Sequence, residues 1–401
     1  MEKINIILQK SIEDILMYDP KNSIEIILKT VMEAILKAER GEFLLSSEEN
    51  NKGNGYYERL VRGVNQYFKL NVPRDRLSLF KPVFLEAIKQ YDAQMQDLAL
   101  KLYVKGLTTR DIESVLGDVF GKKISPTSIS NITKNFEQQR KEWLQRPLDS
   151  EYYFIFIDAL FIPVRRDTVN KEAFYIVMAL RTDLKREILG VYNIPNETAE
   201  GWREVLKDLQ KRGLKKVLMF IADGLNMLSD VVLKEFPASL FQRCIVHKMR
   251  NILLNVRTIH KAQIASDLKE IFTIGDPSYT FEKAQEQLKF FLTKWGKIYP
   301  GLYQKFKDIN NKTYFAYLNF PYQIHKMIYT TNWIERLNKT IRRTQSIRNA
   351  FPNPESALNL ITACLIEQEN NFYLKYPLTF FSGVQNELNF MLVDCPQTQN
   401  C

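Results

Sequence analysis

Aromatic and β-branched residues fill the stretch 152–164, and Asp158 is its one charged side chain. An apolar run of this kind predicts a strand that is buried on both faces of a sheet. A lone ionised carboxylate in such a strand is costly unless it is ion-paired, hydrogen-bonded or bound to a metal. Asp158 therefore needs a partner, and a structural role as a turn cap or an arginine partner competes with a functional one.

The residues after this strand alternate short turns with further apolar runs. Short turns between consecutive strands predict an antiparallel meander. An amphipathic helix comes next, with Asn196 as its predicted N-cap and Gly213 as its predicted stop. The predicted strands are 174–180, 188–192, 217–222 and 240–246, and the predicted helices are 196–213 and a short one that ends near Phe236. This order resembles a ribonuclease H-like mixed sheet, in which the first and fourth strands are neighbours.

Sheet geometry supplies Asp158 with a partner. If the first and fourth strands pair, Asp158 lies close to Asp223, which directly follows the fourth strand. Two carboxylates at that separation repel each other and raise one pKa unless a divalent cation lies between them. The pairing favours metal binding over the structural interpretation of Asp158.

The chain before the sheet is predicted to be mainly helical. Apolar residues recur at helical spacing through 4–35, a polar segment at 46–55 marks a linker, and 56–72 alternates as in a small basic hairpin. Three short helices follow between residues 98 and 140, with Ser125 and Pro126 at the start of the third. This layout is similar to a helix-turn-helix, and an ordinary helical bundle is the alternative. Its candidate DNA contacts are Arg110, Thr127, Ser128, Ser130 and Lys134.

A long segment separates the predicted sheet from a further acidic motif. Residues 261–274 and 281–295 have amphipathic helical patterns, and the segment is too long for a simple loop. Beyond it, Ile334, Leu337 and Ile341 follow helical spacing, while Glu335 lies on another face among lysine and arginine side chains. This mixture fits a helix at a phosphate backbone, or a solvated helix whose charges pair with each other.

Composition limits the class of protein. The 401 residues include 56 Lys and Arg against 46 Asp and Glu, a formal charge of +10 that favours a polyanionic partner. The 4 cysteines lie far apart, which argues against a disulfide framework or a zinc ribbon and favours a reducing cytoplasm. No apolar run approaches a membrane span, and the N-terminus is not patterned as a secretory signal.

An ordered set of segments resembles the prokaryotic Mutator-type insertion-sequence transposases. The segments are FIFIDAL around Asp158, FIADG with Asp223, RCIVHKMRN with Cys244 and His247, TTNWIERLNKTIRR with Glu335, and FPNPESAL from Phe351. The resemblance implies a ribonuclease H-like α/β fold with an α-helical insertion. It also implies that Asp158, Asp223 and Glu335 form a DDE triad that is both catalytic and metal-binding.

The chemistry that the resemblance implies is metal-dependent DNA cutting and joining. Three carboxylates can hold two Mg²⁺ ions, with Mn²⁺ as a substitute, and such ions activate the attacking hydroxyl and stabilise the leaving oxygen. Cys244 and His247 are expected to support the active site, and a zinc site there would need further ligands. The expected partners are double-stranded DNA of the terminal inverted repeats and target DNA. A homodimer or larger assembly on DNA is expected, associated with the nucleoid in the cytoplasm of a prokaryote.

DNA contacts in the catalytic part are expected at basic and polar positions of the same motifs. Trp333 either stacks on an unpaired base or packs in the core. The candidate contacts are Lys248, Arg250, Arg336, Asn338, Lys339, Arg342 and Arg343.

The predicted organisation is multidomain. An N-terminal helical segment (1–50) precedes a DNA-binding region (51–147), the first part of the catalytic domain (148–250), the α-helical insertion (251–328) and the last part of that domain with a C-terminal tail (329–401). The expected function is a DDE transposase of a bacterial insertion sequence. A transposase-derived DNA-binding protein without catalysis is the main alternative, which the three intact carboxylates disfavour. A structure-selective nuclease or resolvase is a further alternative.

Overall fold

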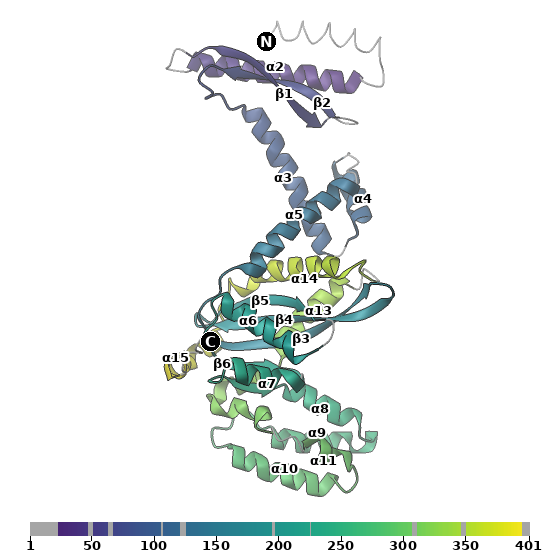
Figure 1. Ribbon diagram of the computed structural model, residues 1–401, viewed down its shortest axis with the longest axis vertical. Helices are drawn as coiled ribbons and strands as arrows, with labels where there is room; N and C mark the ends of the chain where they lie inside the picture. The colour runs from purple at the N-terminus through teal and green to yellow at the C-terminus, as the bar shows by residue number, and fades with distance from the viewer. Residues whose placement is uncertain are drawn as a thin grey trace. The chain divides into compact units, whose positions relative to one another are not determined.

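The computed structural model describes residues 23–46, 51–62, 67–105, 107–120, 126–194, 197–224, 226–306, 311–345 and 350–394. The chain divides into two compact units, of which the first comprises residues 1–102 and 109–132 and the second comprises 103–108 and 133–401. Figure 1 labels their helices and strands. The predicted cap Ser125 lies outside the described residues.

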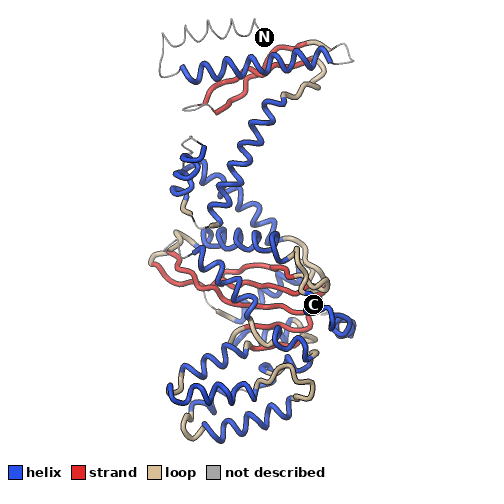
Figure 2. Tube along the Cα trace, turned by 180° about the vertical axis from the view of Figure 1, so that it is seen from behind, coloured by secondary structure: helices blue, strands red, loops and turns tan. Residues whose placement is uncertain are grey.

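In the first unit a helix packs on a two-stranded antiparallel sheet. The helix is α2 (Ser23–Ser46), and the strands are β1 (Gly53–Arg62) and β2 (Tyr67–Asp75), drawn in red beneath it in Figure 2. Leu36 of α2 and Leu70 and Val72 of β2 are fully buried in one apolar cluster. The hairpin predicted from the alternation at 56–72 is therefore present. The helices α3 (Val83–Val104), α4 (Thr109–Phe120) and α5 (Pro126–Gln145) follow in the chain.

The described residues of the second unit contain a five-stranded mixed sheet with the strand order β5-β4-β3-β6-β7. β3, β4 and β5 pair antiparallel, whereas β6 pairs parallel with both β3 and β7. The predicted pairing of the first and fourth strands is confirmed, with Ile157 opposite Ala222. The strands are β3 (Glu151–Arg165), β4 (Val169–Arg181), β5 (Arg186–Asn193), β6 (Lys216–Ala222) and β7 (Leu240–Arg243).

Helices cover both faces of this sheet (Figure 1). On one face, Trp202 of α6 (Ala199–Lys211) and Phe236, just after α7 (Asn226–Glu235), share an apolar cluster with Ile157 of β3. On the other face lie α13 (Asn332–Gln345) and α14 (Pro354–Gln368). Trp333 of α13 packs on Phe156, with ring centroids 5.2 Å apart. β3 is thus buried on both sides, as its apolar run predicted.

Two predicted boundaries are wrong. The N-cap of α6 is Thr198 rather than Asn196, since the Thr198 hydroxyl accepts a hydrogen bond from the Gly201 amide at 3.1 Å. β7 ends at Arg243 rather than at Val246, because Cys244 is already the N-cap of the next helix, α8 (Ile245–Leu254). The apolar pair after Cys244 thus belongs to a helix and not to the strand.

Helices occupy most of the chain between β7 and α13. They are α8 (Ile245–Leu254), α9 (Thr258–Ile271), α10 (Phe281–Trp295), α11 (Gly301–Phe306), α12 (His325–Ile328) and the short 3-10 helices η1 (Asn311–Tyr314), η2 (Ala316–Asn319) and η3 (Tyr322–Ile324). After α14 come the π-helical turn η4 (Glu369–Tyr373), the 3-10 helix η5 (Thr379–Val384) and α15 (Gln385–Asp394). Phe351, which precedes α14, bridges to Val164 at the end of β3.

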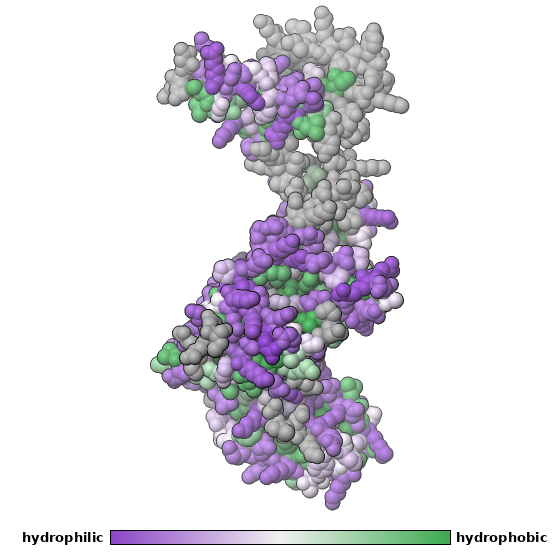
Figure 3. Space-filling model, viewed as in Figure 1, coloured by the Kyte–Doolittle hydropathy of each residue, from purple (hydrophilic) through white to green (hydrophobic). Residues whose placement is uncertain are grey.

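The surface visible in Figure 3 is mainly hydrophilic over the described residues, and apolar side chains appear on it in separate small patches. Among the helices of the described residues, none has both the length and the apolarity that a bilayer crossing requires.

Gly213 allows the chain to turn from α6 into β6. Its φ is +123°, and a Cβ added there would lie 2.7 Å from the Leu148 carbonyl oxygen. We expect Gly213→Ala to lower the free energy of unfolding by about 2 kcal/mol or more, because the backbone conformation and the clash both oppose a side chain. Urea denaturation followed by circular dichroism measures this. Gly301→Ala is the matched control, since nothing lies within 4 Å of its added Cβ; equal effects of the two substitutions would contradict the prediction.

Candidate active site

Asp158 lies in the middle of β3 and is 7% exposed. Its Oδ2 accepts a hydrogen bond from the Asn338 side-chain amide of α13 at 2.7 Å. Burial raises the pKa of Asp158 to about 6; the Asn338 hydrogen bond and the His247 charge oppose this rise, and the Asp223 charge adds to it. Among the described residues this carboxylate has no arginine partner. The structural interpretation of Asp158 as an arginine partner therefore does not hold.

Asp223 directly follows β6, in the turn before α7. Its Oδ1 accepts the Gly224 amide at 2.7 Å, and the same atom lies 3.4 Å from His247 Nδ1. The parallel pairing of β3 with β6 thus carries Asp223 to the neighbourhood of Asp158, where the two carboxylates repel each other.

Glu335 lies in the first turn of α13. Its Oε1 lies 3.6 Å from His247 Nδ1 and accepts the hydroxyl of buried Thr331 at 3.4 Å. Its Oε2 lies 3.4 Å from the Arg250 guanidinium. The packing of α13 over β3 therefore directs Glu335 toward the same histidine that contacts Asp223.

His247 lies in the first turn of α8, three residues after the buried Cys244. A hydrogen bond with Cys244, assisted by the charges of Asp223 and Glu335, raises the pKa of His247 to about 9, although burial opposes this. Burial also acts to raise the pKa of the Cys244 thiol, but hydrogen bonds with His247 and Thr331 hold it below its ordinary value. His247 thus lies between Asp223 and Glu335, and its charge also acts on Asp158.

The donor atoms of this cluster suit a divalent cation. Ligand atoms of Cys244, His247 and Glu335 all lie within 4.8 Å of one another. Cys244 and His247, which were predicted to need further ligands to bind zinc, therefore have Glu335 as one such ligand within reach. Asp223 adds a carboxylate oxygen at 3.4 Å from His247. Carboxylate oxygens are ligands that Mg²⁺ accepts, whereas a thiolate and an imidazole are ligands that zinc accepts.

The predicted DNA contacts have different surroundings. Lys248 is partly buried, donates to the Lys305 carbonyl and lies over the rings of Phe306 and Tyr314 at 4.8 and 4.6 Å. The exposed candidates are Arg110, Arg250, Arg336, Lys339, Arg342 and Arg343. The side chains of Thr127, Ser128, Ser130 and Lys134 lie outside the described part of the structure. Trp333 packs between Phe156 and Phe381, which agrees with its core interpretation.

Asn338 departs from its prediction as a DNA contact. It is 0% exposed and donates to Asp158 instead of facing solvent. The sequence contained a signal for this, because Asn338 follows Ile334 by four residues and precedes Ile341 by three, on the apolar face of α13. Thr331, the fully buried partner of Glu335, was also missed.

Comparisons with known proteins identify the family of the chain. The family model described as "Transposase, Mutator family" matches residues 2–374. The chain belongs to the Mutator family of transposases. The resemblance inferred from the ordered motifs is thereby confirmed.

Curated relatives support the same assignment. The transposase for insertion sequence element IS905 of Lactococcus lactis is 31% identical over 350 residues, which is 86% of this chain and 88% of the relative. The transposase for IS1201 of Lactobacillus helveticus is 34% identical over 76% of this chain and 82% of the relative. The transposase for IS256 in transposon Tn4001 of Staphylococcus aureus is 29% identical over 89% of this chain and 93% of the relative.

Among solved structures, a Drosophila P element transposase strand transfer complex matches 70% of this chain and 85% of its own, at 14% identity and a TM-score of 0.21. This likeness is too weak to support an argument about the site.

Proposed function

We propose that this transposase binds the terminal inverted repeats of its own element and cuts and joins DNA strands with a divalent metal at Asp158, Asp223 and Glu335. The observation that supports the proposal is the contact of Asp223 and Glu335, from β6 and α13, with His247, together with the electrostatic interaction of Asp158 in β3 with His247 and Asp223, in a member of a transposase family. Three acids drawn together in a half-buried site repel one another, and a bound cation relieves that repulsion.

The proposal includes the finer fold assignments. The antiparallel β3, β4 and β5 followed by parallel β6 and β7 support a ribonuclease H-like catalytic domain. The succession of α3, α4 and α5 supports a helix-turn-helix in the region 51–147. An assembly of two or more copies on paired DNA ends belongs to the same proposal.

The chemistry divides between the metal and the side chains. Bound Mg²⁺ or Mn²⁺ would polarise the scissile phosphate and lower the pKa of the attacking hydroxyl. Asn338 holds the Asp158 carboxylate in one orientation through the hydrogen bond at 2.7 Å. Thr331 and Arg250 do the same for the two oxygens of Glu335. The exposed Lys339, Arg342 and Arg343 of α13 supply positive charge for the DNA backbone.

Metal dependence tests the proposal directly. The purified chain is incubated with a labelled duplex that carries its element end, in Mg²⁺, in Mn²⁺ or in excess EDTA, and the strands are resolved on a denaturing gel. We expect cleaved and joined strands with either metal and none with EDTA, because the carboxylates act through the cation. A duplex with a scrambled end is the matched control. Binding of the duplex without cleavage in either metal would favour the DNA-binding protein that lacks catalysis.

A further inference from the structure

Arg186, the first residue of β5, is a buried cation that has no acidic partner among the described residues. It is 9% exposed, and its guanidinium lies 4.2 Å from the ring centroid of Tyr373 and 5.1 Å from that of Phe372. Among the described residues these two rings are its cation–π contacts, and its Nε is buried without a hydrogen-bond partner.

The charge of Arg186 is incompletely neutralised. A buried charge is costly without a partner, and a cation–π contact stabilises it by only about 2 kcal/mol. Burial holds the pKa of the Arg186 guanidinium below its ordinary value; Tyr373 opposes this effect, and the positive charge of Arg336 adds to it. Arg336 is exposed and also forms no ion pair within the described residues. Two unpaired arginines within electrostatic reach of each other favour an anion.

The surface beside Arg186 is aromatic and basic. Phe372 is 50% exposed and packs on Tyr376, which is 49% exposed, with ring centroids 5.6 Å apart. Lys375 lies over the Tyr376 ring at 5.5 Å. Exposed rings interleaved with cations are typical of surfaces that bind a nucleic-acid strand.

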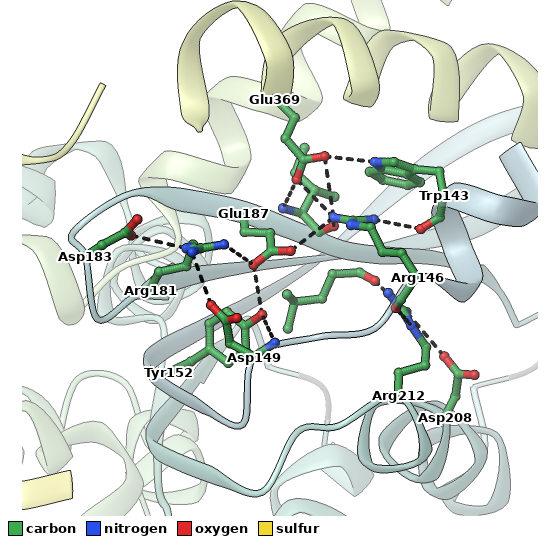
Figure 4. Close-up of polar contacts among 12 residues, drawn as sticks. Trp143, Arg146, Asp149, Tyr152, Arg181, Asp183, Glu187, Asp208, Arg212 and Glu369 are labelled. Atoms are coloured by element: carbon green, nitrogen blue, oxygen red, sulfur yellow. Dashed lines mark hydrogen bonds and ion pairs between the residues drawn. The ribbon is translucent and has the colours of Figure 1, made fainter. Parts of the chain in front are cut away.

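A buried network holds this surface in place (Figure 4). Glu369 begins the π-helical turn that presents Phe372 and Tyr373. Its carboxylate accepts the Ile188 amide of β5 at 2.7 Å, the Trp143 indole at 2.8 Å and the Arg146 guanidinium at 3.1 Å. The turn is therefore fixed to the strand that carries Arg186, and π-helical turns are frequent at functional sites.

Sheet register relates Arg186 to the carboxylates. Arg186 is opposite Leu180, which is opposite Phe154, so Arg186 shares a face of the sheet with Phe154 and Asp158. The offset from Asp158 is about 13 Å along the strands and about 10 Å across them, from the ordinary strand spacings. Arg336 directly follows Glu335 on α13, and its charge acts on both Arg186 and Tyr373. The separation corresponds to a few nucleotides of a DNA strand.

We propose that Arg186, Arg336 and the rings of Phe372 and Tyr373 form a subsite for the phosphodiester backbone of the DNA strand that passes through the carboxylate cluster. This inference rests on the proposed function; Arg336 is already a candidate DNA contact from its motif, and Arg186, Phe372 and Tyr373 are added to it. The arginines bind phosphate oxygens, and the exposed ring of Phe372 packs against a neighbouring sugar or base.

The salt dependence of DNA binding tests the subsite. The full chain and its Arg186→Met and Arg336→Gln variants are titrated by fluorescence anisotropy with a labelled duplex that carries the element end, over a series of salt concentrations. Each phosphate contact contributes about 0.9 to the slope of log K against log salt, so each variant should lower that slope by about one unit. We also expect roughly tenfold weaker binding at moderate salt for each.

Two further variants keep the test decisive. Lys207→Gln is the matched control, because it removes one exposed positive charge on α6, across the sheet from α13, and it should leave the slope unchanged. Phe372→Ala, at a half-exposed position, should weaken binding several-fold with little change in slope. If Arg186→Met does not fold, as judged by its melting temperature, Arg336→Gln and Phe372→Ala decide the matter.

The outcomes separate the two proposals. A wild-type slope in Arg336→Gln and a wild-type affinity in Phe372→Ala would overturn the subsite, and so would a wild-type slope in folded Arg186→Met. If the wild-type chain cleaves the duplex while these variants bind it normally, only the subsite fails. If the wild-type chain does not bind DNA, both the subsite and the proposed function fail.

Discussion

Asp158→Asn, Asp223→Asn and Glu335→Gln are each expected to lower the rate of DNA strand cleavage by about a thousandfold or more, because a metal ion contributes several kcal/mol of transition-state stabilisation. The substitutions keep the shape of each side chain and remove its charge. Single-turnover cleavage of a labelled element end in Mg²⁺ measures the effect. Glu204→Gln, at an exposed position of α6, is the matched control and should cleave normally.

Asp158→Asn separates activity from stability. Burial raises the pKa of Asp158 to about 6, so the folded state holds a proton on this group more tightly than the unfolded chain does. Ionisation of this carboxylate is therefore more costly in the folded state. The free energy of unfolding falls as the pH rises from about 4 to about 6, and it stays lowered at higher pH. In metal-free buffer at neutral pH, Asp158→Asn should melt at or above the wild-type temperature while losing cleavage. A variant that cleaves at the wild-type rate, or one that loses activity because it unfolds, would contradict the assigned role.

Glu369→Ala is expected to have the largest effect on stability, a loss of about 3 to 5 kcal/mol in the free energy of unfolding. Glu369 is 2% exposed and accepts hydrogen bonds from a β5 amide, an indole and a guanidinium. Removing it leaves the Ile188 amide buried without its acceptor and takes one acidic partner from the half-buried Arg146, for which Glu187, at 3.4 Å, is the other among the described residues. Urea denaturation of the full chain measures the loss.

A neighbouring acid provides the control for this prediction. Glu367, two residues earlier, pairs with Lys105 at the surface. Glu367→Gln should cost less than about 1 kcal/mol, because exposed ion pairs contribute little. Glu369→Gln keeps a carbonyl oxygen for the Ile188 amide and should fall between the two. A loss in Glu369→Ala no larger than that in Glu367→Gln would show that the network does not hold the turn.

The sequence predicted the sheet well where the pattern was strong. The aromatic run of β3 indicated a strand buried on both faces, the apolar run of β6 indicated a further strand, and the order of elements indicated that these strands pair. The expected closeness of Asp223, at the end of β6, to Asp158 followed from that pairing. Glu335 was recognised from its motif, because nothing in helical spacing alone directs it toward a sheet more than a hundred residues earlier in the chain.

Contacts between distant segments could not be read from local patterns. Glu369 and Ile188 are 181 residues apart, and a buried Glu in a π-helical turn has no periodicity of its own. Arg186 carries no local signal of its burial, because that burial depends on two rings from the same distant segment. The spacing of Asn338 indicated that it lies on the buried face of its helix, but its polar side chain led to the wrong prediction of a DNA contact.

The hydrogen bond between Asp158 and Asn338 joins residues that are 180 positions apart. At ordinary synthesis rates, about 10 to 40 s separate the appearance of these two residues from the ribosome. During that interval β3 can pair with β4 and β6, but the helix that completes the carboxylate cluster does not yet exist. A growing or truncated chain therefore has no assembled site. In an enzyme proposed to break DNA, this delay keeps incomplete copies inert until most of the chain has been made.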